Sequence, residues 1–276
     1  MDFAYYNGSY LPYDSIYVPL SDRAIFFGDG VYECLIGSGG KIYQWKEHIE
    51  RLKNSLRAMR LSFSDFETLY NYAMELIKLS QLERYILYIQ ISRKSERRIH
   101  ATSDFSKFNL LMTVTELSPF DSVCPSLITR EDVRYRMCNV KTLNLIPAVL
   151  ASHDALLSGA DEAVFIRDGV VTECAHSNIF ILEGDRLLTH EEGNLILSGI
   201  TRSTLIRLAM KYGIKTVECE FSPDRLFTAD EVLITSTTRL VRRVAAIDGV
   251  ALKMRNSALA ERLIDMLRSD FIEFCC

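Results

Sequence analysis

The stretch 85-YILYIQIS-92, followed by 108-FNLLMTVTE-116, decides the fold class. In both segments an apolar side chain recurs at every second position, which is the pattern of a β-strand with one face on a core. Two such segments in succession predict neighbouring strands of an antiparallel sheet. Strands and helices elsewhere in the chain do not alternate strictly, as a parallel doubly wound sheet would require, so the sequence favours an α+β fold.

Hairpins and helices are predicted on the N-terminal side of these strands. Asn7-Gly8 is a strong signal for a two-residue hairpin turn. A capping box of Ser64 and Glu67 predicts the start of a helix. The other elements expected here are strands over 2–6 and 10–13 around Asn7-Gly8, strands over 31–36 and 41–43 around the turn 37–40, and a helix over 45–59.

The nine residues 118-SPFDSVCPS-126 interrupt the periodic patterns with two prolines. Such a stretch is typical of a linker, so we predict a smaller domain over 1–117 and a larger one over 127–276. Pro147 is expected to be the first residue of a helix that Gly159 stops. Later elements expected are a hairpin of 162–167 and 170–173 about Asp168-Gly169, a helix capped by Thr201 and ended by Gly213, and a helix from Asn256.

The composition is that of an ordinary globular protein. The chain has 276 residues, 48% of them hydrophobic, and a formal net charge of −4, which gives no general attraction to nucleic acid. The longest stretch without a charged residue, 142–153, is too short to span a membrane. The start, MDFAYYNGSY, lacks the features of a secretory signal, and a cytoplasmic location is expected. Seven scattered cysteines without a CxxC pair predict reduced thiols and no metal site.

Two residues are candidates for chemistry. Lys141, in 138-CNVKTLNL-145, has no acid nearby in sequence. A lysine in an apolar site can lose its proton near neutral pH and attack a carbonyl to form a Schiff base, although this segment alone favours a lysine that reaches out to solvent. Glu173, at the end of a predicted strand, could keep a heteroaromatic nitrogen protonated, or it could be an ordinary surface glutamate.

Three further segments could bind anions. The segment 198-SGIT-201 leads into a helix, whose free N–H groups and dipole favour phosphate, and 235-TSTT-238 offers hydroxyl and amide donors at a turn. The basic run 93–100 could bind a carboxylate through its arginines, or it could be a solvated loop. The absence of the glycine-rich motifs GxGxxG and GxxxxGK(S/T) argues against dinucleotides and nucleoside triphosphates.

Taken together, these segments resemble the fold-type-IV (class IV) pyridoxal-phosphate-dependent aminotransferases, whose motifs they match in order over nearly the whole chain. The motifs that carry the resemblance are 21-SDRAIFFGDGVYE-33, 48-HIERL-52, 140-VKTLN-144, 171-VTE-173 with 177-SNIF-180, 199-GITR-202 and 235-TSTT-238. The resemblance implies a two-domain α+β architecture with the active site between the domains, and pyridoxal 5′-phosphate (PLP) as cofactor.

The resemblance also implies a role for each candidate residue. Lys141 would form the aldimine with PLP and move the proton between the substrate Cα and the cofactor, and Glu173 would pair with the pyridinium nitrogen. The phosphate would be held by Arg51, Ile200, Thr201 and Thr237. The substrate carboxylate would be surrounded by Tyr32, Arg98 and His100, the last two reaching over from the other subunit of a homodimer.

Within the family, the chain is most similar to the D-amino-acid aminotransferases, because Arg98-Ile99-His100 matches their Arg-x-His pair. This likeness implies ping-pong transamination between D-amino acids and 2-oxo acids. A branched-chain L-amino-acid aminotransferase, an aminodeoxychorismate lyase and a non-catalytic ligand-binding protein of the same fold remain alternatives. Three positions depart from the usual pattern: Ile36 lies near a usual lysine, while Cys174 and His176 replace small residues. They leave the preferred side chain open.

Overall fold

The computed structural model describes residues 3–94, 97–101 and 104–275, and the contacts divide the chain into two compact units. The first unit comprises Met1–Pro119, Val140–Asn144 and Phe274–Cys276, and the second comprises Phe120–Asn139 and Leu145–Glu273. The short segment that carries Lys141 therefore makes its contacts with the N-terminal unit. The domain boundaries predicted from the sequence stay a prediction.

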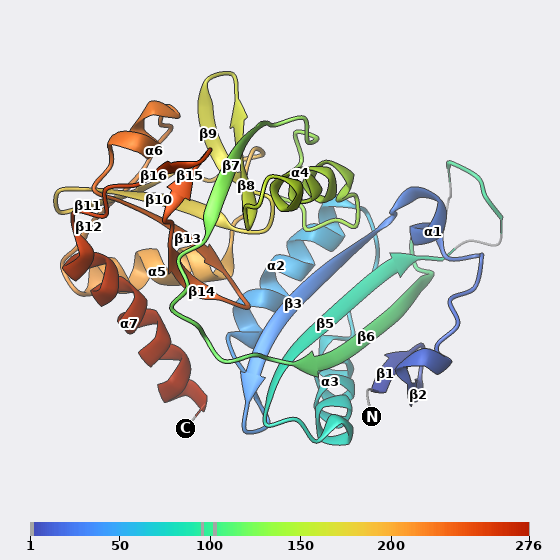
Figure 1. Ribbon diagram of the computed structural model, residues 1–276. Helices are drawn as coiled ribbons and strands as arrows, with labels where there is room; N and C mark the ends of the chain where they lie inside the picture. Colours follow the sequence, from blue (N-terminus) through green and yellow to red (C-terminus); the bar gives the residue numbers. More distant parts are fainter. Residues whose placement is uncertain (1–2, 95–96, 102–103, 276) are drawn as a thin grey trace. The chain divides into compact units, whose positions relative to one another are not determined.

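The first unit is built on one antiparallel sheet of six strands in the order β2-β1-β6-β5-β3-β4 (Figure 1). The predicted strands 85–92 and 108–116 are confirmed as β5 and β6, which pair antiparallel from Tyr85↔Glu116 to Arg93↔Phe108. The strands are β1 (Phe3–Tyr6), β2 (Ser9–Pro12), β3 (Gly30–Ser38), β4 (Lys41–Ile42), β5 (Arg84–Arg93) and β6 (Phe108–Glu116). The helices are η1 (Tyr13–Ser15), α1 (Arg23–Phe27), α2 (Trp45–Ala58) and α3 (Phe66–Ser80).

The hairpin turns of this unit follow the local sequence. Asn7 and Gly8 have φ values of 46° and 98°, as a two-residue hairpin turn requires, and β1 pairs with β2 across them. Residue 2, the predicted first residue of β1, lies outside the described residues. Gly39 and Gly40 also have positive φ and join β3 to β4. The helix predicted over 45–59 is confirmed as α2.

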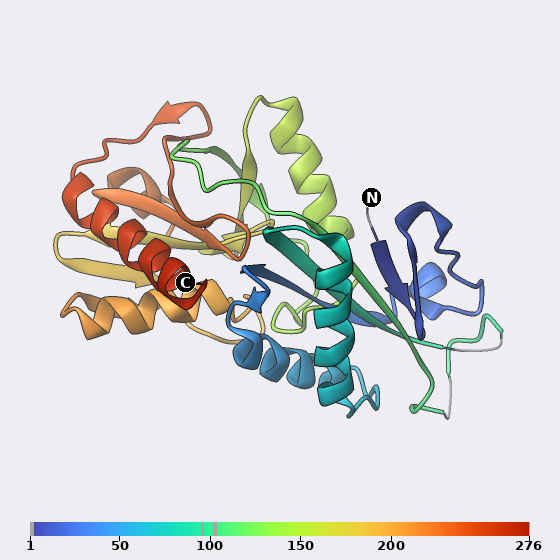
Figure 2. The same ribbon diagram turned by 90° about the horizontal axis from the view of Figure 1, so that it is seen from below.

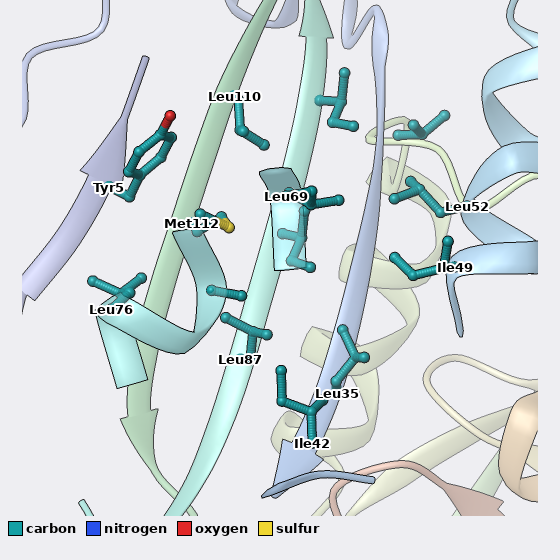
Figure 3. Packing of buried hydrophobic residues seen from close by; sticks show 14 of the residues in the cluster. Tyr5, Leu35, Ile42, Ile49, Leu52, Leu69, Leu76, Leu87, Leu110 and Met112 are labelled. Atoms are coloured by element: carbon teal, nitrogen blue, oxygen red, sulfur yellow. The ribbon is translucent and has the colours of Figure 1, made fainter. Parts of the chain in front are cut away.

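The core of the first unit lies between the sheet and the two longer helices. Figure 3 shows Ile49 and Leu52 of α2, together with Leu69 and Leu76 of α3, pointing toward the strands. Burial of such a side chain is worth about 1.5–3 kcal/mol, so this layer holds α2 and α3 on one face of the sheet. The predicted start of α3 is one residue early, since Asp65 is the N-cap and accepts a hydrogen bond from the Thr68 N–H at 3.1 Å.

The second unit contains two five-stranded sheets, in the orders β12-β11-β10-β13-β14 and β16-β15-β7-β8-β9 (Figures 1 and 2). Their strands are β7 (Ser126–Glu131), β8 (Glu162–Arg167), β9 (Val170–Cys174), β10 (Asn178–Glu183), β11 (Arg186–Thr189), β12 (Lys215–Glu218), β13 (Glu231–Ser236), β14 (Leu240–Arg243), β15 (Ala246–Ile247) and β16 (Val250–Ala251). The helices are α4 (Ile146–Leu157), α5 (Ile200–Lys211), α6 (Asp224–Thr228) and α7 (Ser257–Cys275).

The predicted hairpin about Asp168-Gly169 is confirmed, with φ values of 51° and 79° at the two turn residues. Two predicted helix starts are slightly wrong. Gly199, not Thr201, is the N-cap of α5, and Pro147 is the second residue of α4 rather than the first. No helix among the described residues combines the length and apolar character that a membrane span needs.

Candidate active site

Lys141 lies against the edge of the sheet in the first unit. Its carbonyl oxygen accepts the Tyr32 N–H at 3.0 Å, and its own N–H donates to Ser55 Oγ at 3.1 Å. Thr142 forms a bridge with Val31 next to it, so both flanks of the lysine are fixed to β3 and α2. The Nζ atom lies 4.2 Å from the centroid of the Tyr32 ring, where the ring face attracts an ammonium group. The two predicted residues Lys141 and Tyr32 are therefore in contact.

Arg51 is fixed by a buried carboxylate that the sequence reading did not single out. Glu33 accepts from Arg51 Nε at 2.8 Å and Nη2 at 2.7 Å, and its Oε2 lies 2.7 Å from His48 Nδ1. Burial raises the pKa of Glu33, but the charges and hydrogen bonds of Arg51 and His48 outweigh it and lower the pKa to about 2. The alternation of side chains along β3 could have identified Glu33, because it places Glu33 on the sheet face opposite to that of Tyr32.

Arg98 and His100 are exposed and pack on α1. The Arg98 guanidinium lies 5.2 Å from the centroid of the Phe27 ring, and the His100 ring lies 5.2 Å from the same ring. Arg23 holds their backbone, donating to the carbonyl oxygens of Ile99 and His100. Within one chain, Tyr32 thus lies beside Lys141 while Arg98 and His100 lie on the surface, and the carboxylate site shared between two subunits stays a prediction.

Glu173 is buried at the end of β9 in the second unit. Its carboxylate accepts from Asn178 Nδ2 at 2.9 Å, from the Leu197 N–H at 3.0 and 3.1 Å, and from Arg134 Nη1. Burial raises its pKa to about 7, against the lowering effect of Arg134 and of the Leu197 hydrogen bond. Since a cationic nitrogen would favour the ionised form, this carboxylate suits a protonated heteroaromatic ring.

Arg134 is a second residue that the sequence reading missed. It bonds Asp132 twice at 2.9 Å and stacks on Phe165 with its guanidinium 4.5 Å from the ring centroid. Asp132 is held in turn by Arg167 at 2.9 Å. Nothing local in the sequence links Arg134 to Glu173, which lies 39 positions later, and only the pairing of β7, β8 and β9 brings them together.

The first turn of α5 is a candidate phosphate site. Ile200 and Thr201 begin this helix, which packs against β13, and Thr237 lies in the turn from β13 to β14. A Cβ atom on Gly199 would lie 2.0 Å from Asn178 Oδ1, so only glycine lets the chain pass this close. Asn178 also donates to the Leu197 carbonyl at 2.9 Å and thereby fixes the entry to the helix.

These residues fit a pyridoxal phosphate. Thr235 Oγ1 is buried without a hydrogen-bond partner among the described residues, and Thr235 pairs across β13 and β10 with Asn178. An orphaned hydroxyl beside the site of Glu173 and Asn178 is a place where a polar ligand supplies the missing bond. Helix N–H groups for a phosphate and a carboxylate for a ring nitrogen complete the donor and acceptor set.

Comparison with known proteins agrees with this chemistry. A family model described as "Amino-transferase class IV" matches residues 30–247. D-alanine aminotransferase of Bacillus licheniformis is 36% identical over 251 residues, which cover 88% of this chain and 88% of the relative. The branched-chain aminotransferase of Thermoproteus uzoniensis, solved with norvaline, superposes with a TM-score of 0.89 at 20% identity over 96% of this chain and 93% of that chain. A second branched-chain amino acid aminotransferase, from T.th. and solved with pyridoxamine 5′-phosphate, also gives 0.89, at 23% identity over 97% of this chain and 93% of that chain.

Proposed function

This chain belongs to the class IV aminotransferases, and from that premise we propose that it transfers amino groups between D-amino acids and 2-oxo acids in a ping-pong cycle. The enzyme is PLP-dependent. The observation that carries the choice of D-amino acids is the 36% identity to D-alanine aminotransferase over 88% of both chains. The structure supports PLP-dependent transamination with a lysine beside a tyrosine in one unit and, in the other, a buried carboxylate whose pKa is raised to about 7.

PLP supplies an electron sink that makes a proton on the substrate Cα acidic. We propose that Lys141 binds the cofactor and that its Nζ takes up and returns this proton. Glu173, oriented by Asn178 and the Leu197 N–H, keeps the ring nitrogen protonated, because its carboxylate favours a cation next to it. The cofactor phosphate is assigned to the donors of Arg51, Ile200, Thr201 and Thr237.

For the substrate carboxylate we propose Tyr32 from one chain with Arg98 and His100 from a second chain. Within one chain Arg98 and His100 pack on α1 and are exposed. Apolar side chains are exposed on α1, just before it and next to Arg98 in sequence: Ile25, Leu20 and Ile99 are exposed by 48%, 74% and 51%. Apolar patches of this kind mark interfaces, which supports a homodimer. A cytoplasmic location is part of the same proposal.

The helix α4 supports the dimer independently. Its exposed side chains include Ile146, Leu150 and Leu157, the last 86% exposed. They recur at helical spacing, so one face of α4 is apolar and open in the single chain. Sedimentation analysis should give twice the mass of the chain, and a monomer that is fully active would contradict the shared carboxylate trap.

The test of the reaction is a comparison of substrates. Purified protein loaded with PLP is incubated with 2-oxoglutarate and either D-alanine or L-leucine, and separately with aminodeoxychorismate. We expect pyruvate and glutamate from D-alanine and no comparable turnover of the other two. Turnover of L-leucine alone would make the chain a branched-chain enzyme, and release of pyruvate from aminodeoxychorismate would make it a lyase. A protein that takes up no PLP, judged by its visible absorption, would be a non-catalytic member of the fold.

A further inference from the structure

The sheet face next to Lys141 carries residues to which no function has been assigned above. Along β3 the side chains alternate: Glu33 reaches Arg51 of α2 on the helix side, so Tyr32 lies on the opposite face. Along β5, Ile89 and Ile91 are buried in the core with the helices. Gln90 therefore shares the open face with Tyr32, and the two residues are direct cross-strand partners.

Tyr88 fixes the orientation of Gln90. Its hydroxyl donates to Gln90 Oε1 at 2.8 Å, and its ring packs against Tyr32 with the centroids 5.5 Å apart. Burial raises the pKa of Tyr88, so the hydroxyl stays protonated and remains a donor at every physiological pH. Because the oxygen of the Gln90 amide is taken by this bond, its nitrogen is the end left for another partner.

The nitrogen of Gln90 is available. Within the described residues no hydrogen bond involves Gln90 Nε2, and the side chain is half-buried rather than fully solvated. Directly paired residues on adjacent strands have Cβ atoms about 4.5–5.5 Å apart. The side chains of Gln90 and Tyr32 therefore begin side by side on one sheet face, and Lys141 places its Nζ over the Tyr32 ring.

We propose that Gln90 is a specificity-determining residue that donates a hydrogen bond to the α-carboxylate of the substrate. The inference rests on the proposed function, because it assumes that the reacting carbon is brought to Lys141. A carboxylate has two acceptor oxygens, so one group bridges Tyr32 and Gln90. Cys34, the half-buried cross-strand partner of Tyr88, adds an apolar side chain next to this pair, which strengthens a hydrogen bond to a charged group.

This arrangement distinguishes acids from their neutral analogues. An amide presents one acceptor oxygen and an NH₂ group that cannot accept from a donor, so it gains less from the pair of donors. The substitution Gln90→Leu should lower kcat/KM for D-alanine about 10-fold, mostly through KM, and change that for D-alaninamide less than about 3-fold. Gln90→Glu should lower kcat/KM for D-alanine further, because it places a carboxylate next to the carboxylate of the substrate.

Two further variants separate a local role from general damage. Tyr88→Phe removes the bond that orients Gln90 and should reduce the preference for D-alanine over D-alaninamide in the same direction, to a smaller extent. Thr113→Val changes the residue on β6 that pairs with Tyr88 and should leave the preference unchanged. Melting temperatures identify any variant that has lost its fold.

Equal losses on acid and amide in Gln90→Leu and Tyr88→Phe would overturn the proposal and leave these residues structural. If the wild-type enzyme acts on L-leucine instead of D-alanine, the proposed D-specificity fails. The role of Gln90 is then tested by the ratio of kcat/KM for L-leucine to kcat/KM for L-leucinamide. If it acts on neither, calorimetric binding of propionate decides: wild type should bind it about 10-fold more tightly than Gln90→Leu, and equal binding would refute the role of Gln90.

Discussion

Arg134 and Glu173 form a hydrogen-bonded ion pair at the end of β9, although the two residues lie on different parts of the chain. Burial of Glu173 raises its pKa to about 7, and the guanidinium works against this rise. The pair therefore leaves the carboxylate near its titration point at neutral pH, where a bound cationic ring nitrogen can decide its charge.

Removal of the guanidinium should push the pKa of Glu173 further up. In Arg134→Met we expect Glu173 to remain protonated at pH 7 in the cofactor-free protein, since the effect of burial is then opposed by the Leu197 hydrogen bond but no longer by the guanidinium. Infrared spectra over pH 5–9, with Glu173→Gln to assign the band, measure this directly. Arg130→Met is the matched control, because Arg130 pairs with Asp154 near the surface. An unchanged titration in Arg134→Met would show that the ion pair does not control Glu173.

The same pKa makes the stability of the cofactor-free protein depend on pH. A glutamate that titrates near 4.5 when unfolded and near 7 when folded binds more protons in the folded state between these values. Stability should therefore fall as pH rises from about 4.5 to about 7, by about 1.4 kcal/mol for each pH unit. Glu173→Gln should remove this slope and be more stable than wild type at pH 8 in urea unfolding, whereas parallel pH curves would contradict the raised pKa.

Glu33 should also make stability depend on pH, but in the opposite direction and at lower pH. Its folded pKa of about 2 lies below the ordinary 4.5, so the bonds to Arg51 and His48 stabilise the fold above pH 4.5 and are lost as pH falls toward 2. Glu33→Gln should lower the free energy of unfolding by about 3 kcal/mol at pH 7 and by much less at pH 2.5. Urea unfolding at both pH values measures this difference. Glu50→Gln is the control, because Glu50 is exposed and pairs with Lys53.

Lys141→Ala should abolish transamination while the sheet stays folded, because the contacts that hold this segment come from its backbone. Borohydride reduction of loaded wild-type protein followed by peptide mass analysis should place the cofactor on the peptide with Lys141. Lys53→Ala, at a half-buried position of α2 where the lysine pairs with Glu50, should keep full activity. A tag on another lysine would transfer the proposed role to that residue.

The local sequence predicted the turns and strands that depend on local backbone geometry. The hairpin turns at Asn7-Gly8 and Asp168-Gly169 follow from residues that accept a positive φ, and β5 and β6 follow from alternation. The partners of Glu173 could not be predicted this way. Arg134 and Leu197 reach it from 39 positions before and 24 positions after, and pattern in one segment carries no information on such contacts. Lys141 and Glu173 were candidates from their local segments, and the motif resemblance, rather than periodicity, assigned their roles.

The start of α5 shows how one glycine can connect the proposed phosphate site to the proposed ring-nitrogen site. Asn178 touches both, through the Leu197 carbonyl and Glu173, and it fills the space where a Cβ of residue 199 would lie. Gly199→Ala should displace Asn178, weaken PLP binding at least 10-fold and shift the absorption of the bound cofactor, because both ends of the ring lose their alignment. Gly193→Ala is the matched control, since a Cβ there meets no atom within 4 Å. Equal PLP affinity in the two variants, measured by titration of the cofactor-free protein, would mean that Asn178 moves without cost and does not couple the two sites.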